Sequence, residues 1–415
     1  MTSPDTAGPG APLRYLLRWL LLGTLVGVPA GSAAALLLFA LNWAGVARAA
    51  HPWLLALLPL AGFGVAWIYL RIGRAAEAGN NLLIDAIHDP EQQVPLRMAP
   101  LVLGGTFVSH LFGASVGREG TAVQMGGALA AGLARLLRLG HEDRRILLTA
   151  GIGAGFSAVF GTPLAGAVFG LEVLAIGRMR YDALLACMVA AIVGDQACLA
   201  WGAQHAHYAV GAVPAPTLWP LLATMVAGAA FGLAGRGFAL ATHALGGWMK
   251  RCLPYAPLRA LAGGAVIAAA GWILGAERYL GLGLPTIAAA FAQPLPAWDF
   301  AGKMAFTVAS LASGFKGGEV TPLFFIGATL GNALAPLLQL PFPLLAGLGF
   351  VAVFAGAANV PIASTLMAIE LFGADIGVHA ALACVLAYLF SGHAGIYRAQ
   401  RIGRHKYVVL PPREY

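Results

Sequence analysis

Four acidic side chains lie inside long apolar stretches, where a charge is costly and therefore marks a candidate functional position. Glu119 and Glu319 lie in glycine-rich breaks ahead of helical patterns, whereas Glu172 and Glu370 end two short helical patterns that begin with Pro. The first turn of a helix has unpaired N–H groups that attract an anion. We therefore expect Glu119 and Glu319 at an anion site. We expect Glu172 and Glu370 to be structural, by bonding neighbouring backbone N–H groups or reaching an interface.

Glu119, in the run Gly117-Arg118-Glu119-Gly120-Thr121, is the residue we expect to gate a substrate path. Its carboxylate can itself occupy an anion site at a helix start. Protonation would remove that attraction and let an external anion take the vacated position, so that proton and anion binding become coupled. The alternative is a helix cap or an ion-pair partner for Arg118.

Two other polar residues could help to hold an anion. Asn80, in Gly79-Asn80-Asn81, precedes a short apolar helical pattern, where its amide offers donors; the alternative is a plain helix cap. Tyr397 follows the last long apolar stretch, and its hydroxyl could donate to an anion; the alternative is an interfacial anchor. No nucleotide-binding or nucleophile motif is present. We expect no cofactor, no metal site and no catalytic residue.

The elements that position these residues are expected to be membrane-spanning helices. Of 415 residues, 59% are apolar and 10% are charged, too few polar side chains to cover a soluble globule. The 55 Gly and 25 Pro residues cut the apolar stretches, which predicts tilted and broken helices around a path. Arg and Lys gather in short connections, typical of the positive-inside pattern, without the contiguous patch of a nucleic-acid-binding protein. The fold class is therefore an all-α, multi-pass membrane protein.

An internal repeat divides the chain. The segment from Pro163 to Glu172 matches that from Pro361 to Glu370, and the break around Glu119 matches the one around Glu319. The repeat predicts two halves, roughly 13–200 and 215–402, in a single transmembrane domain over 13–402, with a site where the halves meet. We expect a disordered N-terminal tail over 1–12 and a short C-terminal tail over 403–415.

These motifs resemble the CLC family of anion channels and proton-coupled antiporters from about Leu13 to Tyr397. The resemblance rests on the Glu119 run, on Pro163-Leu164-Ala165-Gly166 with Glu172, on the Gly317-Gly318 break and on Tyr397. It implies an inverted-repeat, all-helical protomer in a homodimer, without regulatory CBS domains, in the bacterial inner membrane. It also implies that Glu119 is the external gating glutamate and Tyr397 the central tyrosine, and that the backbone N–H groups of Glu319 and Val320 face the anion.

Four departures from the chloride-selective pattern resemble the fluoride/proton antiporter subfamily. Asn80 replaces a serine, Thr121 replaces a proline, Thr321 belongs to an altered Gly318-to-Pro322 motif, and Val173 replaces an inner proton-transfer glutamate. A small, tightly hydrated anion needs strong donors, which Asn80, Thr121 and Thr321 add. The resemblance implies export of fluoride in exchange for protons; a chloride/nitrate–proton antiporter or a voltage-gated chloride channel is the alternative. The expected supporting residues are Gly117, Arg118, Gly120, Thr121, Gly317 and Gly318.

Overall fold

The computed structural model describes residues 10–206 and 208–407, and these confirm the all-α fold class. The first half contains α1 (Ala11–Ala50), α2 (Leu58–Ile68), α3 (Asn80–His88), α4 (Met98–Leu111), α5 (Glu119–Leu136), α6 (His141–Phe160), α7 (Pro163–Glu172) and α8 (Leu184–Ala200). The second half contains α9 (Leu218–Cys252), α10 (Ala256–Ile273), α11 (Leu284–Ala292), α12 (Asp299–Ser313), α13 (Val320–Leu338), α14 (Phe342–Ala358), α15 (Pro361–Phe372) and α16 (Gly377–Phe390).

Short elements join these helices. They are η1 (Pro52–Leu57), η2 (Tyr69–Gly73), η3 (Arg74–Ala76), η4 (Tyr181–Ala183), η5 (Glu277–Tyr279) and η6 (Ala374–Ile376), of which η2 is π-helical and the others are 3-10 turns. A two-residue strand β1 (Ala175–Ile176) pairs in parallel with β2 (Arg401–Ile402). This pair attaches the segment that follows Tyr397 to the end of α7.

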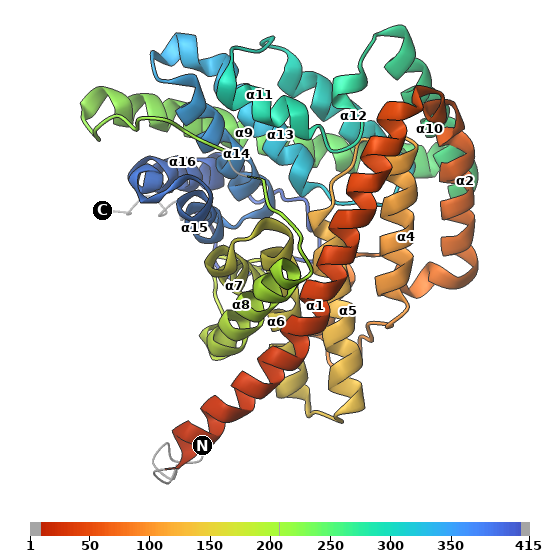
Figure 1. Cartoon of the computed structure of the whole chain (residues 1–415), viewed down its shortest axis with the longest axis vertical. Helices are drawn as coiled ribbons and strands as arrows, with labels where there is room; N and C mark the ends of the chain where they lie inside the picture. Colours follow the sequence, from red (N-terminus) through yellow and green to blue (C-terminus); the bar gives the residue numbers. More distant parts are fainter. Residues whose placement is uncertain (1–9, 207, 408–415) are drawn as a thin grey trace, which may run out of the picture.

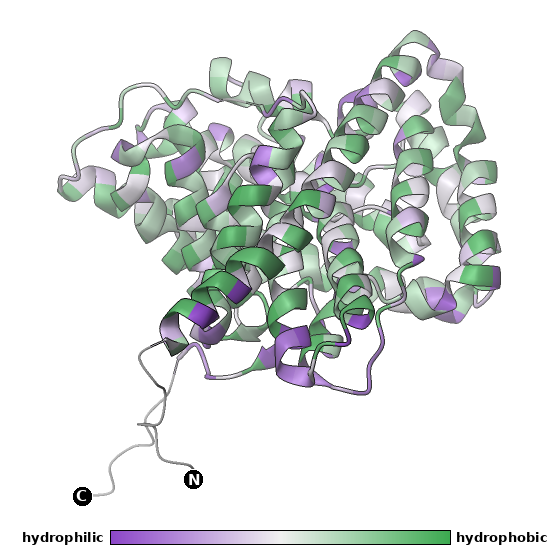
Figure 2. Cartoon of the chain, turned by 60° about the horizontal axis from the view of Figure 1, so that its bottom comes forward, coloured by the Kyte–Doolittle hydropathy of each residue, from purple (hydrophilic) through white to green (hydrophobic). Residues whose placement is uncertain are grey.

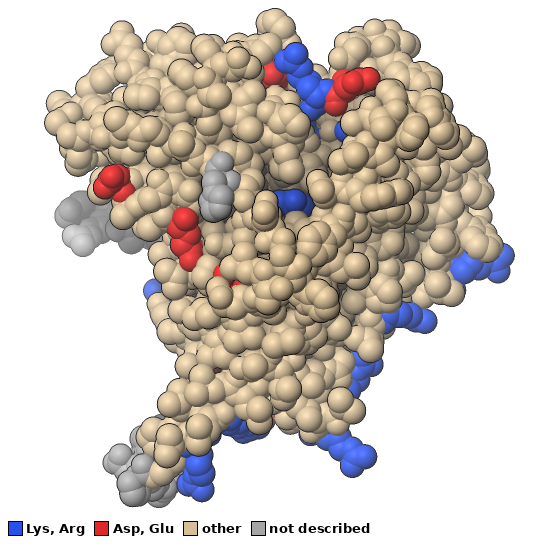
Figure 3. Space-filling view, in the orientation of Figure 1, with Lys and Arg blue, Asp and Glu red and all other residues tan. Residues whose placement is uncertain are grey.

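The chain is a multi-pass membrane protein. Among the described residues, six helical stretches are long and apolar enough to cross a bilayer, and several further apolar helices have only 10–17 residues. The ribbon is apolar over most of its length, and hydrophilic residues concentrate toward one end (Figure 2). Lys and Arg gather along the lower edge in the orientation of Figure 1, where the connection between α5 and α6 lies (Figures 1 and 3). Few are present elsewhere on the visible face.

The corresponding broken helices of the two halves run in opposite directions from the centre of the molecule. α5 runs downward from the centre in Figure 1, whereas α13 runs upward. Between their starts, Gly117 and Gly318 form an antiparallel bridge. The predicted meeting of the two glycine-rich breaks is therefore confirmed.

In each half, the broken helix crosses the helix that follows it at very close range. A Cβ added to Gly126 of α5 would lie 2.2 Å from the Gly151 carbonyl oxygen of α6, and one added to Gly327 of α13 would lie 1.9 Å from the Gly349 oxygen of α14. Both distances are far below an atomic contact. Only glycine lets these backbones touch, as is common between helices in membranes.

The ends of the helices agree with the repeat in the sequence. α6 ends at Gly161 and α14 at Asn359, each in the left-handed conformation, and Pro163 and Pro361 then begin α7 and α15. Left-handed residues end helices, and Pro is favoured in a first helical turn. The two elements thus have the same backbone for the same reason.

Three predicted boundaries were wrong by a few residues. The sequence predicts helices from Ala122 to Leu136 and from Leu323 to Leu338. In the structure, α5 begins at Glu119 and α13 at Val320, because the Arg118 and Glu319 carbonyls accept the first helical N–H groups. Gly120 in the first turn of α5 therefore does not delay that helix. α1 begins at Ala11 with Pro12 in its first turn, so the tail predicted over 1–12 is shorter; residues 1–9 and 408–415 lie outside the described residues.

Candidate functional site

The two glycine-rich breaks lie against each other at the centre of the fold. Gly117 N–H donates to the Gly318 oxygen at 2.6 Å, and Gly318 N–H donates to the Gly117 oxygen at 2.7 Å. Gly317 has a φ of +153°, and a Cβ there would lie 2.4 Å from Val116 Cγ2. Side chains are excluded at this crossing, so the starts of α5 and α13 face each other across it.

The Glu119 carboxylate of the first half accepts hydrogen bonds at the start of the second half's helix. Its Oε2 accepts the Thr321 N–H at 2.9 Å, the Thr321 hydroxyl, and the Arg118 N–H at 3.2 Å. Arg118 Nε lies 3.4 Å from Oε1, and Glu119 is only 1% exposed. The carboxylate therefore occupies donors that could otherwise bind an anion.

Thr121, in the first turn of α5, bonds to α4 and not to the Glu119 carboxylate. Its hydroxyl lies 2.7 Å from the Thr106 hydroxyl of α4, and both residues are fully buried. Sequence reasoning missed Thr106, because a single Thr in an apolar helix has nothing to distinguish it from a packing residue.

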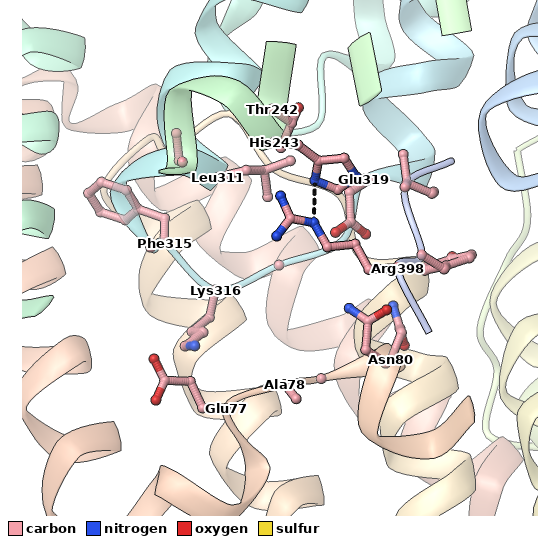
Figure 4. Close-up of a pocket in the computed structure, with 18 of the residues that line it drawn as sticks. Glu77, Ala78, Asn80, Thr242, His243, Leu311, Phe315, Lys316, Glu319 and Arg398 are labelled. Carbon is pink, nitrogen blue, oxygen red and sulfur yellow. Dashed lines mark hydrogen bonds between the residues drawn. The ribbon is translucent and has the colours of Figure 1, made fainter. Parts of the chain in front are cut away.

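Asn80, Glu319 and Tyr397 line one cavity of about 350 Å³, which we call the larger cavity (Figure 4). Asn80 does not cap α3 with its side chain: Gly79 is the capping residue, and Asn80 Oδ1 has no hydrogen-bond partner within the described residues. Its Nδ2 lies 3.0 Å from where a Cβ on Gly120 would be. The amide therefore faces the glycine-rich break, beside Tyr397, which is 4% exposed.

Glu319 lies on the other side of the break from Glu119. Its carboxylate faces the larger cavity, where Oε2 is buried and has no partner among the residues described. Val320 and Thr321 follow it as the first residues of α13, and both are buried. Of the residues predicted to hold the anion, Asn80, Glu319 and Tyr397 thus share the larger cavity, whereas Val320 and Thr321 do not line it.

A smaller cavity of about 30 Å³ lies on the far side of Glu119. Arg118, Glu119 and Thr321 line it together with aromatic side chains from several elements. Among these, the Phe324 and Phe350 rings stack at 4.0 Å. Glu119 and Thr321 thus line the smaller cavity and not the larger one, which Glu319 lines from the other break.

Glu172 and Glu370 have the expected structural role. Glu172 accepts the N–H groups of Ile362 and Ala363 at the start of α15, at 3.1 and 2.8 Å. Glu370 in turn accepts those of Leu164 and Ala165 at the start of α7, both at 2.8 Å. Each half caps the short helix of the other, which ties the two halves together.

Neutralising one of these caps is expected to lower the stability of the folded protein. Gln in place of Glu172 keeps one acceptor oxygen but loses the charge and the second acceptor, at a cost of about 1–3 kcal/mol. The melting temperature of detergent-solubilised Glu172→Gln should therefore fall, and Glu370→Gln should behave alike. Glu142→Gln is the control, because that carboxylate is 65% exposed. Equal melting temperatures for all three variants would contradict the capping role.

Val173 occupies the position at which the family pattern has an inner acid. It is 3% exposed, and its carbonyl accepts the Gln400 side chain at 3.0 Å. Asn81 Oδ1 accepts the Ala399 N–H at 2.9 Å. These bonds hold the segment that carries Tyr397, and Val173 itself offers no group that can carry a proton.

Sequence reasoning also missed basic residues at the larger cavity. Lys316 and Arg398 line it, with His243 of α9 beside Arg398 (Figure 4). The sequence does contain a signal for Lys316, because a Lys directly before Gly317-Gly318 is a charge inside an apolar region. Arg398 follows the last helix, where basic residues are common. Within residues 10–206 and 208–407, no three His, Cys, Asp or Glu side chains are placed to hold a metal ion.

This chain is similar to known proteins in sequence and in fold. A "Chloride/fluoride channel protein" of Pseudomonas syringae pv. tomato is 61% identical over 401 residues, 95% of this chain and 89% of that protein. An H(+)/Cl(−) exchange transporter ClcA of Vibrio cholerae is 27% identical over 310 residues, 66% of this chain and 62% of that one.

Two solved structures superpose on the chain. The crystal structure of a CLC-type fluoride/proton antiporter matches with a TM-score of 0.91 and 34% identity, covering 95% of this chain and 100% of that one. A slow cyanobacterial Cl−/H+ antiporter matches with a TM-score of 0.79 and 22% identity, over 92% and 96% of the chains. The family model described as voltage gated chloride channel matches residues 61–392. The chain belongs to this family, the CLC family of membrane proteins.

Proposed function

We propose that the protein is a fluoride/proton antiporter that exports fluoride through the path gated by Glu119. The observation that carries this proposal is the position of the Glu119 carboxylate, which accepts the backbone N–H and the hydroxyl of Thr321 at the start of α13. When protonated, the carboxylate loses its attraction for these donors and leaves them to an anion. The Glu119 carboxylate and the anion therefore occupy the same donors alternately, and this alternation exchanges protons for anions.

Fluoride is favoured over chloride by the donors around the breaks. A small anion is strongly hydrated and needs several close, strong donors in place of its water. Asn80 and Thr321 add donors at the two cavities, where the chloride-selective pattern has fewer, whereas the Thr121 hydroxyl is bonded to Thr106. The name of the 61% identical protein includes fluoride, and the solved structure that is 34% identical is a fluoride/proton antiporter.

The proposed orientation places the larger cavity on the cytoplasmic side of a bacterial inner membrane. The cavity is lined by Glu77 and Ala78, directly after the basic connection that contains Arg71 and Arg74, and by Lys250 in the last turn of α9. Basic residues in short connections mark the cytoplasmic face. A homodimer is proposed as well, as the family resemblance implies; apolar side chains exposed on α15 and α16, such as Ile362 and Val385, are available for it.

Flux from proteoliposomes tests the proposed function. Vesicles loaded with fluoride or chloride are diluted into buffer free of that anion, and anion efflux is measured with an ion-selective electrode while a pH electrode follows proton movement. Fluoride efflux accompanied by proton uptake is expected, with slower chloride efflux. Faster chloride efflux would refute the fluoride assignment, and anion efflux without proton movement would indicate a channel.

Asn80→Ser is expected to weaken the preference for fluoride. The variant removes the amide donor that faces Gly120 and restores the residue type of the chloride-selective pattern. Loss of one strong donor to an anion corresponds to about 1.5–3 kcal/mol, so the ratio of fluoride to chloride efflux should fall about 10-fold or more. Asn42→Ser on α1 is the matched control, because Asn42 is exposed and lines neither cavity. An unchanged ratio in Asn80→Ser would show that the amide does not select the anion.

A further inference from the structure

The larger cavity has an excess of positive charge along the way to Asn80 and Tyr397. Four basic residues and two acidic ones line it: Lys250, Arg259, Lys316, Arg398, Glu77 and Glu319. Such a cleft concentrates anions and speeds their arrival. A basic group that is free and adjacent to the residues around the break can also bind the anion directly.

Three of the four cations are already engaged or remote. The Lys316 ammonium lies 4.0 Å from the centre of the Tyr69 ring and points toward Glu77 (Figure 4). Arg259 is buried and donates to the Leu253 carbonyl. Lys250 is exposed, as Arg398 is, but it lies in the last turn of α9 and does not adjoin Asn80 or Tyr397 in the chain. None of these three is both free and adjacent to the residues around the break.

Arg398 differs, because it follows Tyr397 directly and only one edge of its guanidinium is used. Its Nε donates to His243 Nδ1 at 3.1 Å (Figure 4). Arg398 is exposed, and among the described residues its terminal nitrogens form no ion pair and no hydrogen bond. Figure 4 shows those nitrogens directed into the cavity. Their N–H groups can form charge-assisted hydrogen bonds to a small anion.

His243 fixes the direction of this guanidinium. His243 Nε2 lies 2.8 Å from the Gly395 carbonyl oxygen, an acceptor only, so Nε2 carries the proton and donates. Nδ1 of the neutral ring is then left to accept from Arg398. The imidazole thus bonds the Gly395 carbonyl, before Tyr397, and the Arg398 guanidinium, after it. These two bonds hold the guanidinium in one orientation.

We propose that Arg398, oriented by His243, is the anion-binding residue of the larger cavity, which captures a halide from the cytoplasm before it reaches Asn80 and Tyr397. This inference rests on the proposed function for the identity of the anion and for the orientation in the membrane. Arg398 lowers the concentration of anion needed on one face only, because it lies on one side of Glu119.

Membrane vesicles of defined orientation test this proposal with the full chain. Everted vesicles present the cytoplasmic face to the medium and right-side-out vesicles present the opposite face. Initial rates of fluoride uptake are measured at increasing external fluoride, with the same imposed proton gradient. Arg398→Gln is expected to raise KM about 3- to 10-fold in everted vesicles, without changing KM in right-side-out vesicles. His243→Phe should raise it in the same direction, and Arg398→Lys should raise it less.

Lys250→Gln is the matched control, since it removes one charge from the same cavity. Its effect on KM should be clearly smaller than that of Arg398→Gln. An unchanged KM for Arg398→Gln in everted vesicles would overturn the proposal. An equal rise of KM on both faces would also overturn it, because it indicates a disturbance of Tyr397. So would an equal rise of KM in Lys250→Gln, because it indicates an effect of diffuse charge. If the natural chain exchanges no fluoride for protons in these vesicles, the proposed function fails instead.

Discussion

Replacement of Glu119 by Ala is expected to abolish the exchange of protons for fluoride. The carboxylate is the group that both takes up a proton and competes with the anion for Thr321, so its removal takes away the proton carrier and leaves the donors permanently open. Val173 provides no second acid at the position expected for an inner one. Loss of a positioned proton-transfer group commonly costs 10²–10⁴-fold, and we expect proton flux to fall at least about 100-fold.

Proteoliposomes measure the two ions separately in this variant. Fluoride gradients should no longer drive proton uptake, whereas any remaining fluoride efflux should be independent of pH. Glu142→Gln removes an exposed carboxylate far from the breaks and should retain coupled exchange. Coupled exchange that persists in Glu119→Ala would mean that the proton uses another group, and Glu319 would be the first to examine, because its carboxylate faces the larger cavity.

The sequence was sufficient for the parts of the site that depend on local chemistry. The sequence indicates Glu119 and Glu319 because a carboxylate in an apolar region is costly. The unpaired N–H groups of a helix that starts after a glycine-rich break can offset that cost. The matched segments that begin at Pro163 and Pro361 predicted two related halves. The left-handed residues Gly161 and Asn359, which end the helices before these segments, then follow from the usual way in which helices stop.

The partners of these residues could not be predicted, because they lie in the other half. That Glu119 accepts from Thr321 depends on how the two halves are oriented, and the matched spacing alone does not say whether the repeat is inverted. The same holds for Glu172 and Glu370, which bond backbone N–H groups; neither their segments nor their spacing show that each caps the helix of the other half. Contacts across a repeat are set by tertiary packing, which leaves no local pattern.

Asn80 shows a second limit. Its place before a short helix is typical both of a capping residue and of an anion-binding residue. The choice depends on the rotation of one amide, and the amide turns away from the helix start toward Gly120. Arg398 is similar, since its role depends on His243, which is far away in the sequence.

Gly349→Ala is expected to disrupt both folding and transport, although Gly349 touches no proposed ligand. A Cβ on Gly349 would lie 2.0 Å from the Gly327 carbonyl oxygen, where ordinary contact begins at 3.4 Å. The obstacle is backbone, so α13 and α14 must separate by about 1.4 Å, and overpacking of this kind costs about 1–3 kcal/mol or more. The fraction of protein that elutes as a single folded species in detergent should fall sharply.

The control is Gly237→Ala on α9, where an added Cβ meets nothing within 4 Å and the folded fraction should be retained. The molecules of Gly349→Ala that do fold carry the second part of the prediction. Because α13 presents Thr321 to Glu119, displacement of the helix by about 1 Å should reduce coupled fluoride flux by about 100-fold. Full flux from the folded fraction would show that the start of α13 moves independently of its crossing with α14. Reduced flux would show that the glycine contact between the helices positions the anion donors, so that packing far from the anion determines how well it is bound.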